Sequence, residues 1–142
     1  MSGSLLRRNM CSLIGPTMKI QPDFINVQAI SGYGSGWVAV AGEKISSSLV
    51  LSSTGERFAW DCREFEDLGA NHFRQLAALN TELVIFGSGS RLRFPPPEWL
   101  QPLFERRIGI ETMDTQAACR TYNILAAEGR HVALALLLEA SP

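Results

Sequence analysis

The sequence predicts an α/β fold, a three-layer sandwich with a mixed central sheet, preceded by an N-terminal antiparallel β meander. Short apolar stretches, separated by turns rich in Gly and Ser, run from Phe24 to Trp60 at spacings of about ten residues. After Asn71, segments with helical periodicity alternate with strand-like segments. Two later strands, residues 83–86 and 132–138, are apolar at every position, which is typical of strands buried between two layers. This order of elements favours a central sheet covered on both faces.

The β-rich first half is expected to consist of short strands joined by turns. The predicted strands cover residues 24–30, 37–40, 47–51 and 57–60. The predicted turns cover residues 32–36, 41–44 and 53–56, where Gly combines with Ser, Thr or Glu. Strands at this spacing suggest an antiparallel meander.

The second half begins with a helix and a buried strand. Phe73, Leu76 and Leu79 share one stripe of a helix over residues 71–79. The strand at residues 82–86 follows, and a Gly-Ser loop ends it. Three prolines come next, and the third, Pro97, suits the first turn of a helix that runs to about residue 107.

The remaining elements are a strand, a helix and a strand. A short strand over residues 109–112 leads to Asp114, whose side chain can accept hydrogen bonds from the free N–H groups of the next turn. The helix that Asp114 caps is predicted to end at Gly129, the usual position for glycine after a helix. The final buried strand covers residues 131–138.

Length and charge exclude several classes of protein. A chain of 142 residues corresponds to one domain. Thirteen Lys and Arg against fourteen Asp and Glu give a net charge of −1, whereas nucleic-acid-binding domains usually have a basic excess. The longest apolar run, residues 132–138, is far shorter than the roughly 18 residues of a spanning helix. We therefore expect neither a nucleic-acid partner nor a transmembrane segment.

Residues 1–22 differ from the rest of the chain. They contain no Asp or Glu but include Arg7, Arg8 and Lys19. This composition fits a flexible N-terminal arm on a cytoplasmic bacterial protein, and it also fits a mitochondrial transit peptide, which would place the protein in the matrix. In either case residues 23–142 are expected to form a single α/β domain.

The cysteines and histidines give no sign of a metal or catalytic centre. Cys11, Cys62 and Cys119 lack the spacing of zinc ligands and are expected to be free thiols. The two histidines, His72 and His131, have no neighbouring Ser or Cys motif, so we expect structural or surface roles for them. No metal, cofactor or catalytic residue is therefore predicted.

A candidate ligand site lies where the buried strands end. The Gly-Ser loop after residue 86 could form an anion-binding nest of backbone N–H groups, although it matches neither a phosphate loop, a dinucleotide fingerprint nor a hydrolase elbow. If the strands at residues 83–86 and 109–112 are parallel, their carboxyl ends rim one crevice, the favoured ligand position in open α/β sheets. The candidate ligand-binding residues are Gly87, Ser88, Gly89, Ser90, Arg91, Glu111, Asp114 and Arg120. The alternative is that Asp114 only caps its helix and Arg120 only forms a surface ion pair.

Several segments together resemble a family of small uncharacterised bacterial and archaeal proteins. They are residues 83–90, 94–97, 108–115, 117–125 and 128–130, in which Met-Asp-Thr and Arg-Thr-Tyr-Asn-Ile-Leu are specific in combination. Eukaryotic relatives in that family include a mitochondrial respiratory complex I assembly factor and an adipogenesis-associated protein. The resemblance implies a three-layer α/β fold whose last strand runs antiparallel to the others, with no established catalytic residue or cofactor.

Two functions from different classes stay open at this point. The first, motivated by the resemblance, is a non-enzymatic binding or assembly factor with protein partners, in the maturation of a respiratory membrane complex. The second is a small-molecule or anion-binding domain that uses the crevice, with or without weak catalysis. Enzymatic activity is not favoured, because no complete catalytic motif is present. A homo-oligomer is compatible with both functions.

Overall fold

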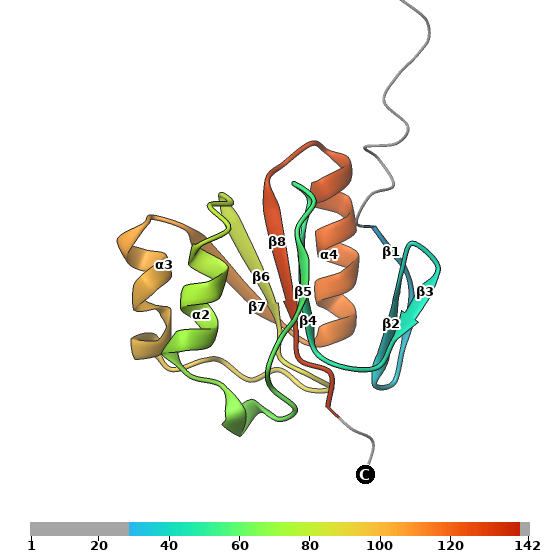
Figure 1. Cartoon of the computed structure of the whole chain (residues 1–142), viewed down its shortest axis with the longest axis horizontal. Coiled ribbons are helices and arrows are strands. Elements are labelled where there is room, and N and C mark those ends of the chain that lie inside the picture. Colours follow the sequence, from blue (N-terminus) through green and yellow to red (C-terminus); the bar gives the residue numbers. More distant parts are fainter. Residues whose placement is uncertain (1–28, 140–142) are drawn as a thin grey trace, which may run out of the picture.

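The computed structural model describes residues 29–139, so the predicted N-terminal arm lies outside the described residues. The described residues form two separate sheets and three α-helices, arranged as in Figure 1. The smaller sheet contains β1 (Ile30–Gly34), β2 (Trp37–Val40) and β3 (Glu43–Ile45). The larger sheet contains β4 (Leu49–Ser52), β5 (Arg57–Ala59), β6 (Leu83–Gly87), β7 (Gly109–Met113) and β8 (Val132–Leu136). The helices are α2 (Ala70–Ala77), α3 (Gln101–Glu105) and α4 (Thr115–Ala127), with the short 3-10 helices η1 (Phe65–Asp67) and η2 (Pro97–Leu100).

The larger sheet is mixed and has the strand order β5-β4-β8-β6-β7. β6 is parallel to both β7 and β8, whereas β4 is antiparallel to β8 and to β5. The expectation that the last strand is the antiparallel one is therefore wrong, because β4 has that role. The reason is the connection: β8 follows β7 through the crossover helix α4, and such a crossover returns the chain as a parallel strand.

The predicted three-layer sandwich is confirmed, with one hydrophobic core on each face of the larger sheet. Helices α2 and α3 cover one face, where Val84 and Phe86 of β6 point. Helix α4 and the smaller sheet cover the other face, where Ile85 points. Successive strand residues point to opposite faces, which explains why β6 and β8 are apolar at nearly every position. Within the described residues, no helix has the length and apolar character needed to cross a membrane.

The predicted meander is divided between the two sheets. β1 to β3 form the smaller sheet, while β4 and β5 join the larger sheet through β8. Most of the predicted strand at residues 24–30 lies outside the described residues, and β1 instead extends through Gly32 and Gly34, which we expected in a turn. The indole of Trp37 lies over these glycines, and a Cβ atom at Gly34 would overlap it. Their role is therefore close packing within a strand, while Ser35 and Gly36 make the turn.

A buried tyrosine in α4 gives a test of the core. The Tyr122 side chain is fully buried, and its hydroxyl has no hydrogen-bond partner among the described residues. Burial also raises the pKa of Tyr122. An unsatisfied buried hydroxyl costs about 1–3 kcal/mol. We expect Tyr122→Phe to raise the free energy of unfolding by about 1 kcal/mol in urea denaturation. A clear loss of stability would show that the hydroxyl has a partner.

Candidate functional site

A crevice of about 960 Å³ opens at the carboxyl edge of the larger sheet. It is lined by the β1–β2 turn, by Arg63 and Glu64, by the residues that follow β6 and β8, and by the first turn of α4. After β6 the chain leads to α3 on one face, and after β7 it leads directly into α4 on the other. Such a change of face marks the favoured ligand position in open α/β sheets.

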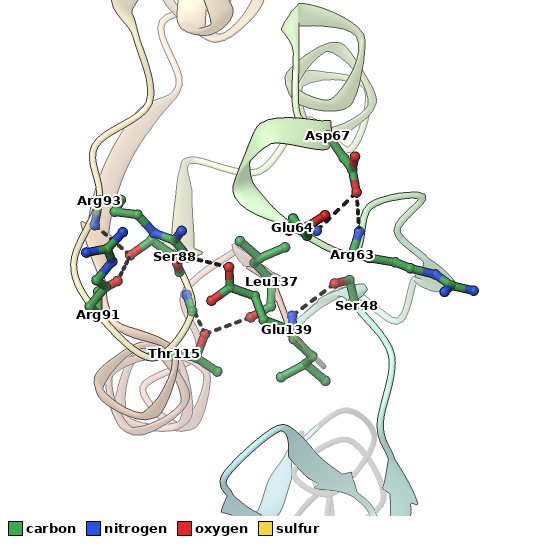
Figure 2. A network of polar contacts seen from close by, with 12 residues as sticks. Ser48, Arg63, Glu64, Asp67, Ser88, Arg91, Arg93, Thr115, Leu137 and Glu139 are labelled. Carbon is green, nitrogen blue, oxygen red and sulfur yellow. Dashed lines mark hydrogen bonds and ion pairs between the residues drawn. The ribbon is translucent and has the colours of Figure 1, made fainter. Parts of the chain in front are cut away.

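Ser88 fixes the loop that follows β6. This residue is fully buried, and its hydroxyl donates a hydrogen bond of 2.8 Å to the Arg91 carbonyl oxygen. The same hydroxyl accepts a hydrogen bond of 2.9 Å from the Arg93 backbone N–H. Figure 2 shows these contacts on one side of the crevice. The backbone of the loop is thus held on both sides of Leu92.

Thr115 joins the loops that follow three strands. Its hydroxyl donates to the Leu137 carbonyl oxygen at 3.1 Å and accepts from the Gly89 N–H at 3.0 Å. Its own N–H donates to the Gly89 carbonyl oxygen. The neighbouring Asp114 accepts a hydrogen bond of 3.0 Å from the Ala117 N–H, which confirms the predicted helix cap. These bonds fix the positions of the crevice walls relative to one another.

An ion pair between Arg93 and Glu139 lies beside the crevice. The nitrogen Nη2 of Arg93 is 2.7 Å from Glu139 Oε2 and also donates to the Ser88 carbonyl oxygen at 2.7 Å. The guanidinium stacks over the Phe65 ring, 5.0 Å from its centroid. Both charged side chains are mostly buried, with exposed fractions of 17% and 26%. Figure 2 shows Glu139 between the loop after β6 and residues 63–67.

Only some of the predicted ligand-binding residues line the crevice. Gly89, Ser90 and Asp114 line the crevice. Gly87 and Ser88 are buried beneath it, and a Cβ atom at Gly87 would lie 3.1 Å from the Thr115 Cα atom, so this glycine permits close approach of α4.

The other predicted residues are not among those that line the crevice. Arg91 is exposed on the loop beside it, and Glu111 is exposed on β7. Arg120 is exposed on α4, where its Nη1 atom donates to the Tyr33 hydroxyl at 3.1 Å. Together with the Asn123 side-chain amide, which bonds to both the N–H and the carbonyl oxygen of Ile30, Arg120 attaches β1 to α4.

Arg93, Thr115 and Glu139 are not among the site residues predicted from the sequence. Glu139 directly follows the apolar run of the last strand, so the strand-end rule that selected Ser88 would also have selected Glu139. Thr115 stands beside the recognised cap Asp114. Arg93 has no local signal, because its role depends on Phe65 and Glu139, which are far away in the sequence.

The charges of the crevice favour some ligands over others. Three carboxylates, those of Glu64, Asp114 and Glu139, contribute to its lining, against the single guanidinium of Arg63. Arg93 neutralises Glu139 from the side. Because like charges repel, this lining suits neutral or cationic groups better than the phosphate that a Gly-Ser loop suggests.

His72, Cys62 and Cys119 are not among the residues that line the crevice, and both thiols are buried. His72 accepts a hydrogen bond from the Gly69 N–H and contacts the Asp61 carbonyl oxygen, outside the crevice. Burial raises the pKa of Cys62 to about 11 and that of Cys119 to about 12, so both thiols stay protonated and weakly nucleophilic near neutral pH. Among residues 29–139, no group of His, Cys, Asp and Glu could hold a metal ion.

Comparison with known proteins identifies the family. A family model described as "Protein of unknown function (DUF498/DUF598)" matches residues 30–137. The chain belongs to this family. The match confirms the resemblance found in the sequence, and it includes the crevice residues up to Leu137.

Individual members of the family differ in length and in name. An uncharacterised protein of Rhodobacter capsulatus is 32% identical over 117 residues, which cover 82% of this chain and 90% of that one. The mouse protein named NADH dehydrogenase (ubiquinone) 1 alpha subcomplex assembly factor 3 is 28% identical over 120 residues, which cover 83% of this chain. The aligned part is 64% of the mouse protein, so the chain spans less than two thirds of that relative.

A solved structure supports the fold. The crystal structure of a Bordetella parapertussis protein is similar to this chain, with a TM-score of 0.75 and 37% sequence identity. The similarity covers 80% of this chain and 97% of that protein. The chain therefore shares its fold with this solved structure.

Proposed function

We propose that this protein is a non-enzymatic binding protein that assists the assembly of a respiratory membrane complex. The observation that carries this proposal is the similarity, over 83% of the chain, to a relative named as an assembly factor for NADH dehydrogenase. The role would place the protein in the bacterial cytoplasm, or in the mitochondrial matrix if residues 1–22 act as a transit peptide.

The geometry of the carboxyl edge supports binding more than catalysis. The hydroxyls of Ser88 and Thr115 form hydrogen bonds with backbone groups, and Arg93 is paired with Glu139. These groups hold loops in fixed positions and are not free to transfer protons or to attack a substrate. A fixed, water-exposed edge of this kind is well suited to recognising a partner, because its loops lose little conformational entropy when the partner binds.

Deletion of the gene tests the assembly role. We expect membranes of the deletion strain, separated on native gels, to contain less fully assembled NADH dehydrogenase and more of its partial assemblies. Restoring the gene should return both to normal, which controls for effects on neighbouring genes. A deletion strain with an unchanged pattern of assembled and partial complexes would contradict the proposal.

A small-molecule site is the second candidate function, and the crevice favours it. Its volume of about 960 Å³ lies in the range of ligand pockets. Its carboxylates favour a neutral or cationic ligand. The anionic ligand that the sequence suggested is therefore less suitable.

Thermal denaturation of the purified chain, screened with amines, amino acids and nucleotides, tests this second function. A ligand at a hundred times its dissociation constant would stabilise the fold by about 2.7 kcal/mol. Glu64→Gln should reduce the effect of a cationic ligand, whereas Glu105→Gln, on the remote helix α3, should not. A screen in which no compound raises the melting temperature would remove this candidate.

A further inference from the structure

The loop over residues 90–94, beside the crevice, holds two large apolar side chains in water. Leu92 is 51% exposed and Phe94 is 68% exposed. We propose that this 90–94 loop is the docking surface for a segment of a partner protein that combines apolar with acidic residues. The inference rests on the proposed binding function and names the surface and the chemistry of its partner.

The exposure of these side chains is imposed by the structure of the loop. The Ser88 hydroxyl holds the backbone at Arg91 and at Arg93, on either side of Leu92. The Arg93 side chain is in turn held by Glu139 and by the Ser88 carbonyl oxygen. Three prolines follow Phe94, and the first of them, Pro95, is buried. Leu92 and Phe94 therefore have little freedom to fold back onto the protein surface.

This concentration of exposed apolar groups is unusual within the chain. Four large apolar residues are exposed in the described part of the chain, namely Leu92, Phe94, Phe104 and Ile124. Two of them fall within three consecutive residues of one short loop, whereas Phe104 and Ile124 lie on different helices. Single exposed apolar residues need no explanation, whereas apolar residues that form a contiguous exposed surface often mark an interaction site. A fixed loop also binds at a lower entropic cost.

Charge indicates the chemistry of the partner. Arg91 is exposed, and its guanidinium forms no ion pair among the described residues. The nearby Arg93, in contrast, is paired with Glu139. A free positive charge next to Leu92 selects an acidic side chain in whatever binds there, because complementary charges favour encounter and disfavour wrong partners.

A lipid surface fits this loop less well than a protein segment does. One arginine contributes about 1 kcal/mol of attraction to an anionic membrane. The chain as a whole has a net charge of −1, so its overall field adds no attraction. Two apolar side chains and one arginine thus give a weak membrane anchor, whereas a few residues can carry most of the binding energy of a protein interface.

Selection of displayed random peptides tests the proposal with the full purified chain. We expect the enriched peptides to combine aromatic or aliphatic residues with Asp or Glu. They should bind the double variant Leu92→Ser/Phe94→Ser about tenfold more weakly or worse. The matched control, Phe104→Ser/Ile124→Ser, removes apolar groups of similar exposure and should bind like the native chain. Arg91→Glu should reverse the charge preference and enrich peptides that contain Lys or Arg.

Three results would overturn the proposal. The first is a selection in which no enriched peptide requires Leu92 and Phe94 for binding. The second is unchanged charge preference in the Arg91→Glu variant. The third is sedimentation of the native chain, but not of Leu92→Ser/Phe94→Ser, with vesicles of phosphatidylglycerol and phosphatidylcholine, since this would make a membrane the occupant. The selection needs no assembly process, so a deletion strain with normal NADH dehydrogenase would contradict the proposed function without affecting this result.

Discussion

Replacing Gly89 with alanine is expected to lower the free energy of unfolding by about 3 kcal/mol. Gly89 has φ +104, a conformation that costs an L-residue about 1–3 kcal/mol. A Cβ atom there would also lie 2.5 Å from Glu139 Oε1 and 2.7 Å from Arg93 Nη2. Those atoms belong to the ion pair beside the crevice, so the pair would have to separate or shift.

Urea denaturation with a matched glycine separates the two causes. Gly55 has φ +114, but a Cβ atom there would meet nothing within 4 Å. Gly55→Ala should therefore cost only the backbone strain, and less than Gly89→Ala. If Gly55→Ala and Gly89→Ala lowered the free energy of unfolding equally, the ion pair would move aside at no energetic cost. That result would contradict the close packing around Gly89.

Replacing Arg93 with methionine is expected to cost about 2–3 kcal/mol. Methionine keeps much of the side-chain volume but loses the ion pair with Glu139, the hydrogen bond to the Ser88 carbonyl oxygen and the stacking on Phe65. Because Glu139 is only 26% exposed, its charge would be left unpaired in a partly buried position. The value is below that of a fully buried pair because both side chains keep some contact with water.

A second ion pair provides the control for this prediction. Arg130 is 3.0 Å from Glu82, but these side chains are 44% and 51% exposed. Arg130→Met should cost less than about 1 kcal/mol in the same denaturation experiment. Adding Glu139→Gln to Arg93→Met should restore part of the lost stability, because the unpaired charge is removed. If Arg93→Met were as mild as Arg130→Met, the pair would have no special role in fixing the crevice wall.

The sequence predicts the layers of the fold because they depend on local patterns. The unbroken apolar runs in β6 and β8 indicate burial on both faces, and Asp114 and Gly129 mark the ends of α4. β1 was missed in part because glycine usually indicates a turn. Here Gly32 and Gly34 instead make room for the Trp37 indole, a contact between strands that the local sequence does not reveal.

The candidate site could be predicted only in part for a related reason. The position of the loop after β6 follows from the parallel arrangement of β6 and β7, which the sequence suggested correctly. The pairing of Arg93 with Glu139 depends on β8 lying between β4 and β6, and no local pattern specifies that strand order. The exposure of Leu92 and Phe94 likewise follows from the bonds of Ser88 and not from their own sequence.

The proposed function and the proposed docking surface together mean that the protein assists assembly through its carboxyl edge. This is tested by the NADH:quinone oxidoreductase activity of membranes from a deletion strain that carries variant copies of the gene. We expect the native chain and the control Phe104→Ser/Ile124→Ser to restore this activity. The variant Leu92→Ser/Phe94→Ser should accumulate to a normal level in the cell but leave the activity reduced. Full activity in a deletion strain that carries no copy of the gene would contradict a role in assembly.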